Sequence, residues 1–140
     1  MEESKLRLGI FKMKLKLNKN KIKKLEKTIK KSWNKDTCHP DVKIWSKKNP
    51  SKGQCGVTAL VIQDYLGGRI VFNRKLRHIW NTLPNKKEYD LTKDQFLKKT
   101  KIEREGFISR ENAMSNKLAI NSRVKERYKI LKKRVKEKLK

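Results

Sequence analysis

The most apolar segment of the chain lies between residues 53 and 68. Its apolar positions recur at helical spacing: Val57, Leu60, Val61 and Leu66, with Ala59 and Ile62 widening the stripe. A helix that is apolar on most of its surface is typical of a domain interior, so we predict a buried central helix. Gly67 and Gly68 follow it, and glycine suits the left-handed conformation that ends many helices.

Two other segments predict amphipathic helices, from Asn18 to about Lys35 and from Ser122 onward. In the first, apolar residues are spaced by three, four and four: Ile22, Leu25, Ile29 and Trp33. In the second they are spaced by four, three and four: Val124, Tyr128, Leu131 and Val135, with Leu139 continuing the pattern. Each helix is expected to pack one apolar stripe on the core. The intervening lysines are interpreted as a solvated face, with a binding face as the alternative.

Three short runs of β-type residues follow the central helix, at residues 69–72, 77–83 and 88–91. Turn-forming residues separate them, at 73–75 and 84–87. Because such short connections join antiparallel neighbours, we predict a small antiparallel sheet.

The segments before and after this core have weaker patterns. Residues 36–52 form a predicted loop, in which Trp45 either anchors the loop or forms one wall of a substrate cleft. Thr92 with Gln95 has the spacing of a capping box, so a helix is expected to start near Lys93 and to contain Phe96 and Leu97.

Residues 101–121 show no clear period, although their apolar residues suggest some core contact: Phe107, Ile108, Met114, Leu118 and Ile120. A short helix is expected to begin at residues 109–112. Residues 1–17 alternate apolar residues with lysine, which is typical of a strand or of a basic tail. We therefore divide the chain into a basic N-terminal arm at 1–17 and a single α+β domain at 18–140.

Composition adds a strong positive charge to this picture. Lys and Arg number 40 against 14 Asp and Glu, for a formal charge of +26 over 140 residues. Such a field attracts polyanions, so nonspecific, salt-dependent contact of the lysine-rich helices with nucleic acid is one expectation. A general lysine bias of the genome is the alternative. With two cysteines, no apolar segment of membrane-spanning length and no signal-peptide pattern, the expected protein is soluble, reduced and cytoplasmic.

The candidate chemistry begins at Cys55, at the predicted N-terminus of the central helix between Gly53 and Gly56. Free backbone N–H groups and the positive helix end there stabilise a thiolate, and the glycines allow another backbone to approach. Cysteine catalysis also needs an imidazole and an acceptor that orients it. His78 and Asp90 lie on consecutive predicted strands, which can place their side chains on one face.

Neighbouring residues have supporting roles in this hypothesis. Gln54 either polarises a carbonyl oxygen together with the Cys55 N–H or caps the helix, and Trp80 is expected to pack beside His78 and hold the imidazole. Structural roles are the alternative for each triad residue, and Cys38 is interpreted as structural or as a pocket wall. A zinc site that combines the two cysteines with His39 and His78 is disfavoured, because Cys-x-x-Cys and His-x-x-x-His spacings are missing. We expect no metal or cofactor.

Three short motifs resemble the triad motifs of transglutaminase-like proteins in the papain-like superfamily. They are Gly53-Gln54-Cys55, His78-Ile79-Trp80-Asn81 and Asp90-Leu91-Thr92. The chain more closely resembles the small bacterial YunG-like family, over roughly its middle half. That resemblance adds Thr37-Cys38, Trp45-Ser46, Asn49-Pro50 and Gln95-Phe96, with a weaker match at Arg127-Tyr128.

The resemblance implies a papain-like α+β core with Cys55 as nucleophile, His78 as base and Asp90 as the residue that orients the base. It implies no substrate, because the superfamily includes proteases, acyltransferases, deamidases and inactive members. Our first hypothesis is therefore a thiol hydrolase or acyltransferase that acts on an amide, ester or thioester of unknown identity. The second is a non-enzymatic protein that binds RNA through its basic helices.

Overall fold

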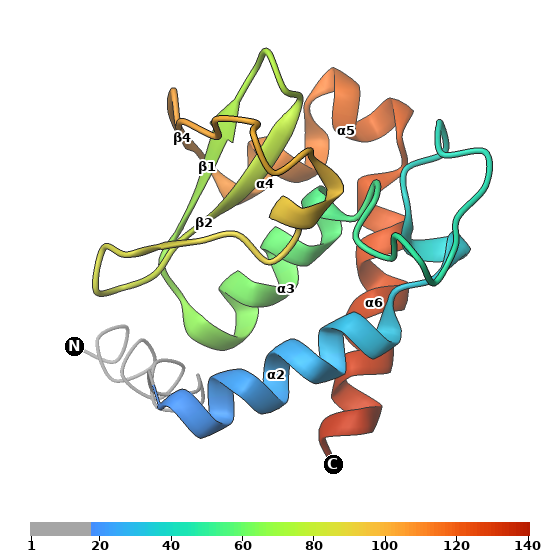
Figure 1. Ribbon diagram of the computed structural model, residues 1–140, viewed down its shortest axis with the longest axis vertical. Coiled ribbons are helices and arrows are strands. Elements are labelled where there is room, and N and C mark those ends of the chain that lie inside the picture. The colour runs from blue at the N-terminus through green and yellow to red at the C-terminus, as the bar shows by residue number, and fades with distance from the viewer. Residues whose placement is uncertain (1–17) are drawn as a thin grey trace.

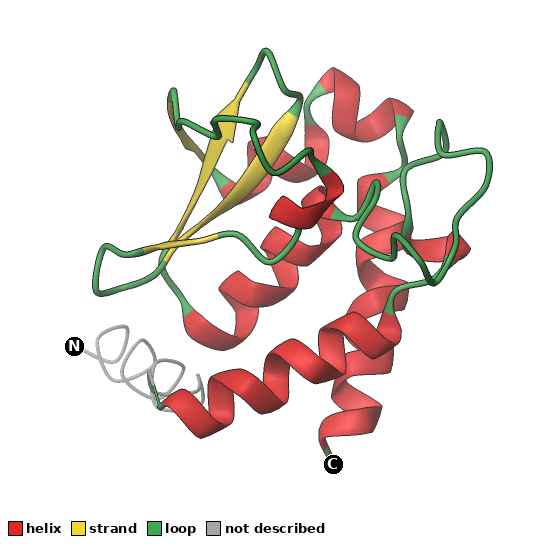
Figure 2. Ribbon diagram, viewed as in Figure 1, coloured by secondary structure: helices red, strands yellow, loops and turns green. Residues whose placement is uncertain are grey.

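The computed structural model describes residues 18–140, so the arm or strand predicted at residues 1–17 lies outside the described residues. The described part is a mixed α+β structure with one four-stranded antiparallel sheet (Figures 1 and 2). Its elements, in chain order, are α2 (Lys19–Ser32), the 3-10 turn η1 (Lys35–Thr37), α3 (Cys55–Leu66), β1 (Arg69–Asn73), β2 (His78–Thr82), β3 (Glu88–Tyr89), the 3-10 turn η2 (Lys93–Gln95), β4 (Gly106–Ile108), α4 (Arg110–Ser115), α5 (Lys117–Asn121) and α6 (Val124–Leu139).

Helix α3 occupies the centre of the molecule, between the sheet and the pair formed by α2 and α6 (Figure 1). Most of its side chains are buried, as its sequence predicts. Two hydrogen bonds fix it from either side: Trp33 Nε1 donates to Thr58 Oγ1 at 2.9 Å, and Asn81 Nδ2 donates to the Ala59 carbonyl at 2.9 Å. Although α3 is strongly apolar, none of the helices within residues 18–140 has the length and apolar character needed to cross a membrane.

Helices α2 and α6 pack against each other through the apolar stripes that their spacing predicts. Leu25 and Ile29 of α2 and Leu131 and Val135 of α6 are completely buried. Burying a large aliphatic side chain contributes roughly 1.5–3 kcal/mol, so these four residues hold both helices on the core. Their lysines remain on the outside.

The strand order in the sheet is β3-β2-β1-β4, with every neighbouring pair antiparallel. The first three strands confirm the predicted sheet. Strand β3 pairs only with Asn81 and Thr82, so it does not extend along β2 as far as His78 and Ile79. The edge of β2 at these two residues is therefore not paired with β3, and the Ile79 N–H on this edge can interact with Cys55.

Two glycines end α3, as predicted, but not in the left-handed helical conformation. Gly67 has φ 77° and ψ −151°, a region open mainly to glycine, and Gly68 has φ 79°. A Cβ on Gly68 would lie 2.0 Å from the Thr82 carbonyl oxygen. The glycine pair therefore lets the chain pass close to the end of β2 as it turns from α3 into β1.

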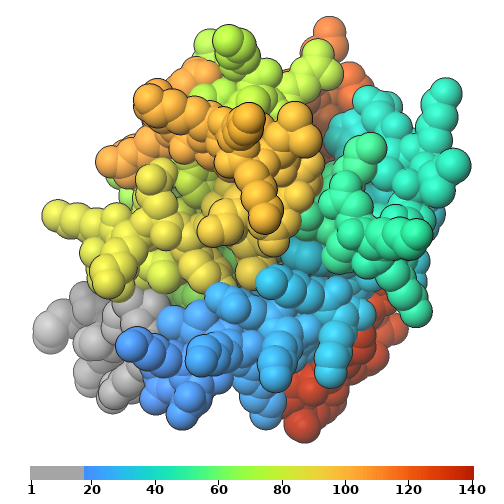
Figure 3. Space-filling view, in the orientation of Figure 1, coloured from blue at the N-terminus to red at the C-terminus, as the bar shows by residue number. Residues whose placement is uncertain are grey.

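The segment after β3 differs from its prediction. Asp90 lies one residue beyond β3 rather than within a strand, and the expected helix is only the three-residue turn η2. Thr92 makes no capping hydrogen bond with its side chain, since its hydroxyl donates to Asp90 instead. Leu97 is exposed. This yellow-to-orange segment, together with blue α2, covers most of green α3 on the face seen in Figure 3.

The region between residues 101 and 121 contains a strand, β4, that its sequence did not predict. The short helix expected near residue 109 is α4, which Ser109 caps by accepting a hydrogen bond from the Asn112 N–H. The expected core contacts are only partly present. Ile108 and Met114 pack on the core, whereas three large apolar side chains are exposed: Phe107, Leu118 and Ile120.

Candidate active site

Cys55 is the first residue of α3, and a tight turn places it there. Gly53 has φ 75°, and its carbonyl accepts a hydrogen bond from the His39 N–H at 2.8 Å. A Cβ on Gly53 would lie 2.9 Å from that backbone nitrogen and 2.8 Å from Val42 Cγ2, so the predicted close approach is confirmed. The same prediction is wrong for Gly56, where a Cβ would meet only a side chain of α6 at 3.6 Å.

His78 and Asp90 form a direct pair, with 2.7 Å between Nε2 and Oδ2. Because a carboxylate can only accept, Nε2 carries the hydrogen of this bond. The Asp90 side chain is held in place by Thr92, whose backbone N–H and hydroxyl both donate to Oδ1, at 3.2 and 3.3 Å. The His78 side chain is fully buried and that of Asp90 is 12% exposed. The imidazole is thus fixed in one orientation.

The Cys55 thiol and the His78 ring interact closely enough to shift each other's pKa. Since Nε2 is occupied by Asp90, Nδ1 is the ring nitrogen left for the thiol. The backbone N–H of Ile79, at the edge of β2 that β3 does not cover, also lowers the pKa of the thiol. The structure therefore brings Cys55, His78 and Asp90 together in the order that a proton relay requires.

These contacts shift the pKa values of Cys55 and His78 in the directions that favour a thiolate and an imidazolium. Burial by itself would raise the pKa of the Cys55 thiol, but the hydrogen bond and charge of His78 outweigh it and lower the pKa below its ordinary 9.0. Burial would likewise lower the pKa of His78, and the hydrogen bonds to Asp90 and Cys55 instead raise it to about 9. A thiolate–imidazolium pair is thus favoured from the lowered pKa of Cys55 up to about pH 9.

Two aromatic rings enclose the imidazole. Trp80 stacks on His78 with 5.1 Å between ring centroids, and Phe96 meets the ring edge-on at 4.8 Å. Trp80 is 3% exposed, and its Nε1 donates to Glu88 Oε1 at 3.1 Å. These contacts correspond to the packing role predicted for Trp80.

The structure places Gln54 and Trp45 in supporting positions. Gln54 is fully buried, and its Nε2 donates to the Asn34 carbonyl at 3.1 Å, whereas Oε1 has no partner. Its side chain gives no capping hydrogen bond to α3, so the first N–H groups of that helix stay open to an anion. Trp45 Nε1 donates to the Pro50 carbonyl at 3.0 Å. This bond fits the alternative in which Trp45 anchors its loop.

A buried arginine of α6 connects the turn before Cys55 to the rest of the domain. Arg127 is 6% exposed and donates to the carbonyls of Ser122 at 2.8 Å, Thr37 at 3.0 Å and Gly53 at 3.5 Å. Desolvation lowers the pKa of Arg127, and electrostatic interaction with the side chains of Cys55 and Cys38 opposes that shift. Arg127 therefore acts as a brace for the Gly53 turn. Only its match to the YunG-like pattern singled it out in the sequence.

Gln95 belongs to the site, although its sequence context suggested a capping role. Its Oε1 accepts from the Gly53 N–H at 3.3 Å, and its Nε2 lies 3.4 Å from His78 Nδ1. It therefore spans the turn before Cys55 and the imidazole. Its match to the YunG-like motif Gln95-Phe96 was the available signal.

The other cysteine and histidine lie in the loop before this turn. Cys38 donates its S–H to the Lys35 carbonyl at 3.1 Å, and His39 Nδ1 accepts from the Asp41 N–H at 3.0 Å. Over residues 18–140, there is no cluster of three or more His, Cys, Asp or Glu side chains that could hold a metal ion.

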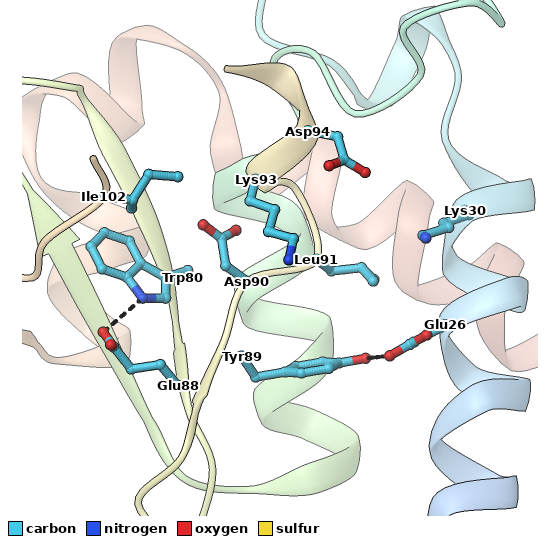
Figure 4. A pocket seen from close by; sticks show the side chains of 10 residues that line it. All are labelled: Glu26, Lys30, Trp80, Glu88, Tyr89, Asp90, Leu91, Lys93, Asp94 and Ile102. Carbon is cyan, nitrogen blue, oxygen red and sulfur yellow. Dashed lines mark hydrogen bonds between the residues drawn. The ribbon is translucent and has the colours of Figure 1, made fainter. Parts of the chain in front are cut away.

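A cavity of about 450 Å³ opens beside the Asp90 end of the site (Figure 4). Its walls come from α2, from β2 and β3, and from the segment after β3. Of the three residues predicted to shape a pocket, Trp80 lines this cavity, and Gln54 and Trp45 do not. The lining residues are Glu26, Lys30, Trp80, Glu88, Tyr89, Asp90, Leu91, Lys93, Asp94 and Ile102.

Comparison with known proteins places this site in one family. The family model described as "YunG protein" matches residues 21–140, which is most of the chain. The uncharacterised protein YunG of Bacillus subtilis (strain 168) is 46% identical over 70 residues, covering 49% of this chain and 56% of that protein. The match thus spans about half the length of this curated relative. No solved structure matches the chain.

Proposed function

The chain belongs to the YunG family, and from its site geometry we propose that it is a papain-like thiol hydrolase or acyltransferase. Its substrate would carry an amide, ester or thioester. The observation that carries the proposal is the buried His78–Asp90 hydrogen bond, at 2.7 Å, next to a Cys55 thiol whose pKa the same imidazole lowers. The opposite pKa shifts of Cys55 and His78 are those of an activated nucleophile and its base.

The topology supports the papain-like assignment. Cys55 begins a buried helix that packs on an antiparallel sheet, His78 begins β2, and Asp90 directly follows β3. This is the order of elements that the sequence resemblance implies. Because one fold can carry many activities, the geometry of the triad supports the proposed chemistry more strongly than the topology does.

In the proposed reaction, Cys55 Sγ attacks the carbonyl carbon and forms a C–S bond. His78 donates its Nδ1 proton to the leaving amine, alcohol or thiol as the bond to the carbonyl carbon breaks. Water or an amine then attacks the acyl thioester, gives its proton to Nδ1 and releases the Cys55 sulfur. Asp90 holds the Nε2–H throughout and stabilises the imidazolium. The Cys55 backbone N–H, at the open N-terminus of α3, is one donor for the oxyanion.

Acylation by 4-nitrophenyl acetate tests this proposal. We expect a burst of nitrophenolate of about one equivalent and an acetyl group on Cys55, detected by peptide mass spectrometry. Cys55→Ala sets the background from the many lysines, and Cys38→Ala is the matched control that keeps the burst. If the burst survives in Cys55→Ala, or is missing from the unmodified protein, the proposal is wrong.

A second candidate function is nonspecific binding of RNA, and the packing of α2 on α6 favours it. These are the two most lysine-rich elements of the described residues, they pack against each other, and their lysines are exposed. Electrostatic binding of this kind weakens steeply with salt and does not need the thiol. We expect a single-stranded RNA to bind at low salt, equally well to Cys55→Ala. If no RNA binds at low salt, this candidate is excluded.

A further inference from the structure

Gln95 has contacts that a surface turn does not need. It lies in η2, none of whose residues is buried, yet its side chain reaches two groups of the site. One is the Gly53 N–H, two residues before Cys55, and the other is Nδ1 of His78, the ring nitrogen that is not bonded to Asp90. Its amide therefore lies beside the reacting atoms.

The orientation of this amide follows from its partners. The Gly53 backbone can only donate through its N–H, so the Gln95 atom at 3.3 Å from it is the oxygen. The Gln95 NH₂ group consequently faces the imidazole, at 3.4 Å from Nδ1. The turn that positions the nucleophile thus also fixes which end of this amide points into the site.

Proton transfer from Cys55 to His78 changes what the NH₂ group can do. With a neutral ring protonated at Nε2, Nδ1 is an acceptor and the amide N–H can donate to it. When Nδ1 gains the thiol proton it becomes a donor, and the amide N–H loses this acceptor. In the thiolate–imidazolium pair that the site favours, Nδ1 is therefore already a donor, and the amide N–H can turn to the carbonyl oxygen that acquires negative charge when Cys55 attacks.

We propose that the Gln95 side-chain NH₂ is an oxyanion donor of this site, paired with the backbone N–H of Cys55. The inference rests on the proposed thiol chemistry and goes beyond it by assigning a residue from η2. Gln54, for which the sequence left an oxyanion donor and a helix cap as alternatives, has its NH₂ directed to the Asn34 carbonyl and its side chain fully buried. Gln95 is the amide that the fold directs at the imidazole.

Two reactions of the same thiol separate this role from a structural one. Alkylation by iodoacetamide is a displacement at a saturated carbon, so no oxyanion forms. Acylation by 4-nitrophenyl acetate passes through a tetrahedral oxyanion. The ratio of the acylation rate to the alkylation rate of Cys55 therefore reports oxyanion stabilisation and cancels changes in thiolate population or in the folded fraction.

We expect Gln95→Met, which keeps the length of the side chain and removes the donor, to lower acylation about 100-fold and to change alkylation less than threefold. Gln95→Glu, which also lacks the NH₂ group, should lower the ratio as well. Gln54→Met alters the other amide of the site and should leave the ratio unchanged, whatever it does to stability.

An unchanged ratio in Gln95→Met would overturn the inference and leave the thiol chemistry standing. Equal losses in both reactions would also overturn it, since Gln95 would then only position the Cys55–His78 pair. Failure of the proposed function looks different. In that case the unmodified protein itself releases no nitrophenolate above the Cys55→Ala background.

Discussion

The two cysteines of this domain have opposite environments, although a backbone hydrogen bond links the segments that carry them. Cys38 follows η1, is 2% exposed and donates its S–H to a backbone carbonyl; burial raises its pKa. Cys55 begins α3 and is partly exposed, and the hydrogen bond and charge of His78 outweigh burial and lower its pKa. The His39 N–H to Gly53 carbonyl bond joins the two regions.

The difference shows what converts a thiol into a nucleophile. Both thiols interact with the buried charge of Arg127, so a nearby cation by itself does not distinguish them. The Cys38 S–H donates to a backbone carbonyl, which favours the neutral thiol. Cys55 meets an imidazole and a backbone N–H, both of which favour the thiolate.

The largest effect is expected from removing the imidazole. In His78→Ala the Cys55 thiol loses the larger influences that lower its pKa and keeps only the Ile79 N–H, so burial then raises the pKa. We expect its alkylation by iodoacetamide at pH 7 to fall about 10- to 100-fold, to a rate like that of Cys38. His39→Ala removes the other histidine and should change the rate less than twofold. A fast Cys55 in His78→Ala would contradict this account.

A smaller effect is expected at Asp90, and it has a definite pH dependence. The bond to Asp90 helps raise the pKa of His78 to about 9, so the imidazolium persists up to that pH. In Asp90→Ala this contribution is lost, the pKa falls, and the imidazolium disappears at a lower pH. NMR titration of His78 should show the decrease, and Cys55 alkylation at pH 8 should drop about tenfold. A His78 pKa still near 9 would exclude Asp90 as its partner.

The Gly53 turn, which links the segments of the two cysteines, can be disrupted without changing either thiol. Gly53→Ala places a Cβ at positive φ, 2.9 Å from the His39 nitrogen, and we expect a loss of about 1–3 kcal/mol in the free energy of unfolding. Cys55 alkylation should slow as the turn shifts. Gly56→Ala is the matched control, because its Cβ meets only ordinary contacts; it should be neutral or stabilise the protein by up to about 1 kcal/mol. Equal stability of both variants in urea would refute the role given to Gly53.

The smallest effect is expected at the other thiol. Cys38→Ser keeps a donor toward the Lys35 carbonyl, so unfolding free energy should change by less than about 1 kcal/mol. The alkylation and acylation rates of Cys55 should stay within twofold of the unmodified protein. A larger loss of acylation would show that Cys38 takes part in the reaction and does not have only a structural role.

Periodicity predicted the parts of this fold that rely on burial. The stripes of α2 and α6, the apolar length of α3 and the first three strands all follow from spacing that a buried face imposes. The approach of Asp90 to His78 was predicted because short connections place consecutive antiparallel strands side by side. Asp90 keeps that position although it lies one residue beyond β3.

The remainder depends on long-range contacts that leave no local pattern. Strand β4 is three residues long, too short for alternation to be visible, and is defined by its pairing with β1. Gln95 resembled part of a capping box, yet its partners are Gly53, 42 residues away, and His78. Gln54 next to the nucleophile suggested an oxyanion donor, and a carbonyl 20 residues upstream directs its amide elsewhere.

The most direct test of the central claim is the pH dependence of alkylation of both thiols in the same unmodified chain. Brief iodoacetamide pulses between pH 5 and pH 10, followed by peptide mass spectrometry, give a rate for each cysteine. We predict that Cys55 reaches half of its maximal rate below pH 9 and that Cys38 reacts slowly until above that pH. Coincident profiles with midpoints at or above pH 9 would show that Cys55 is an ordinary buried thiol, and the assignment of a catalytic triad would fail.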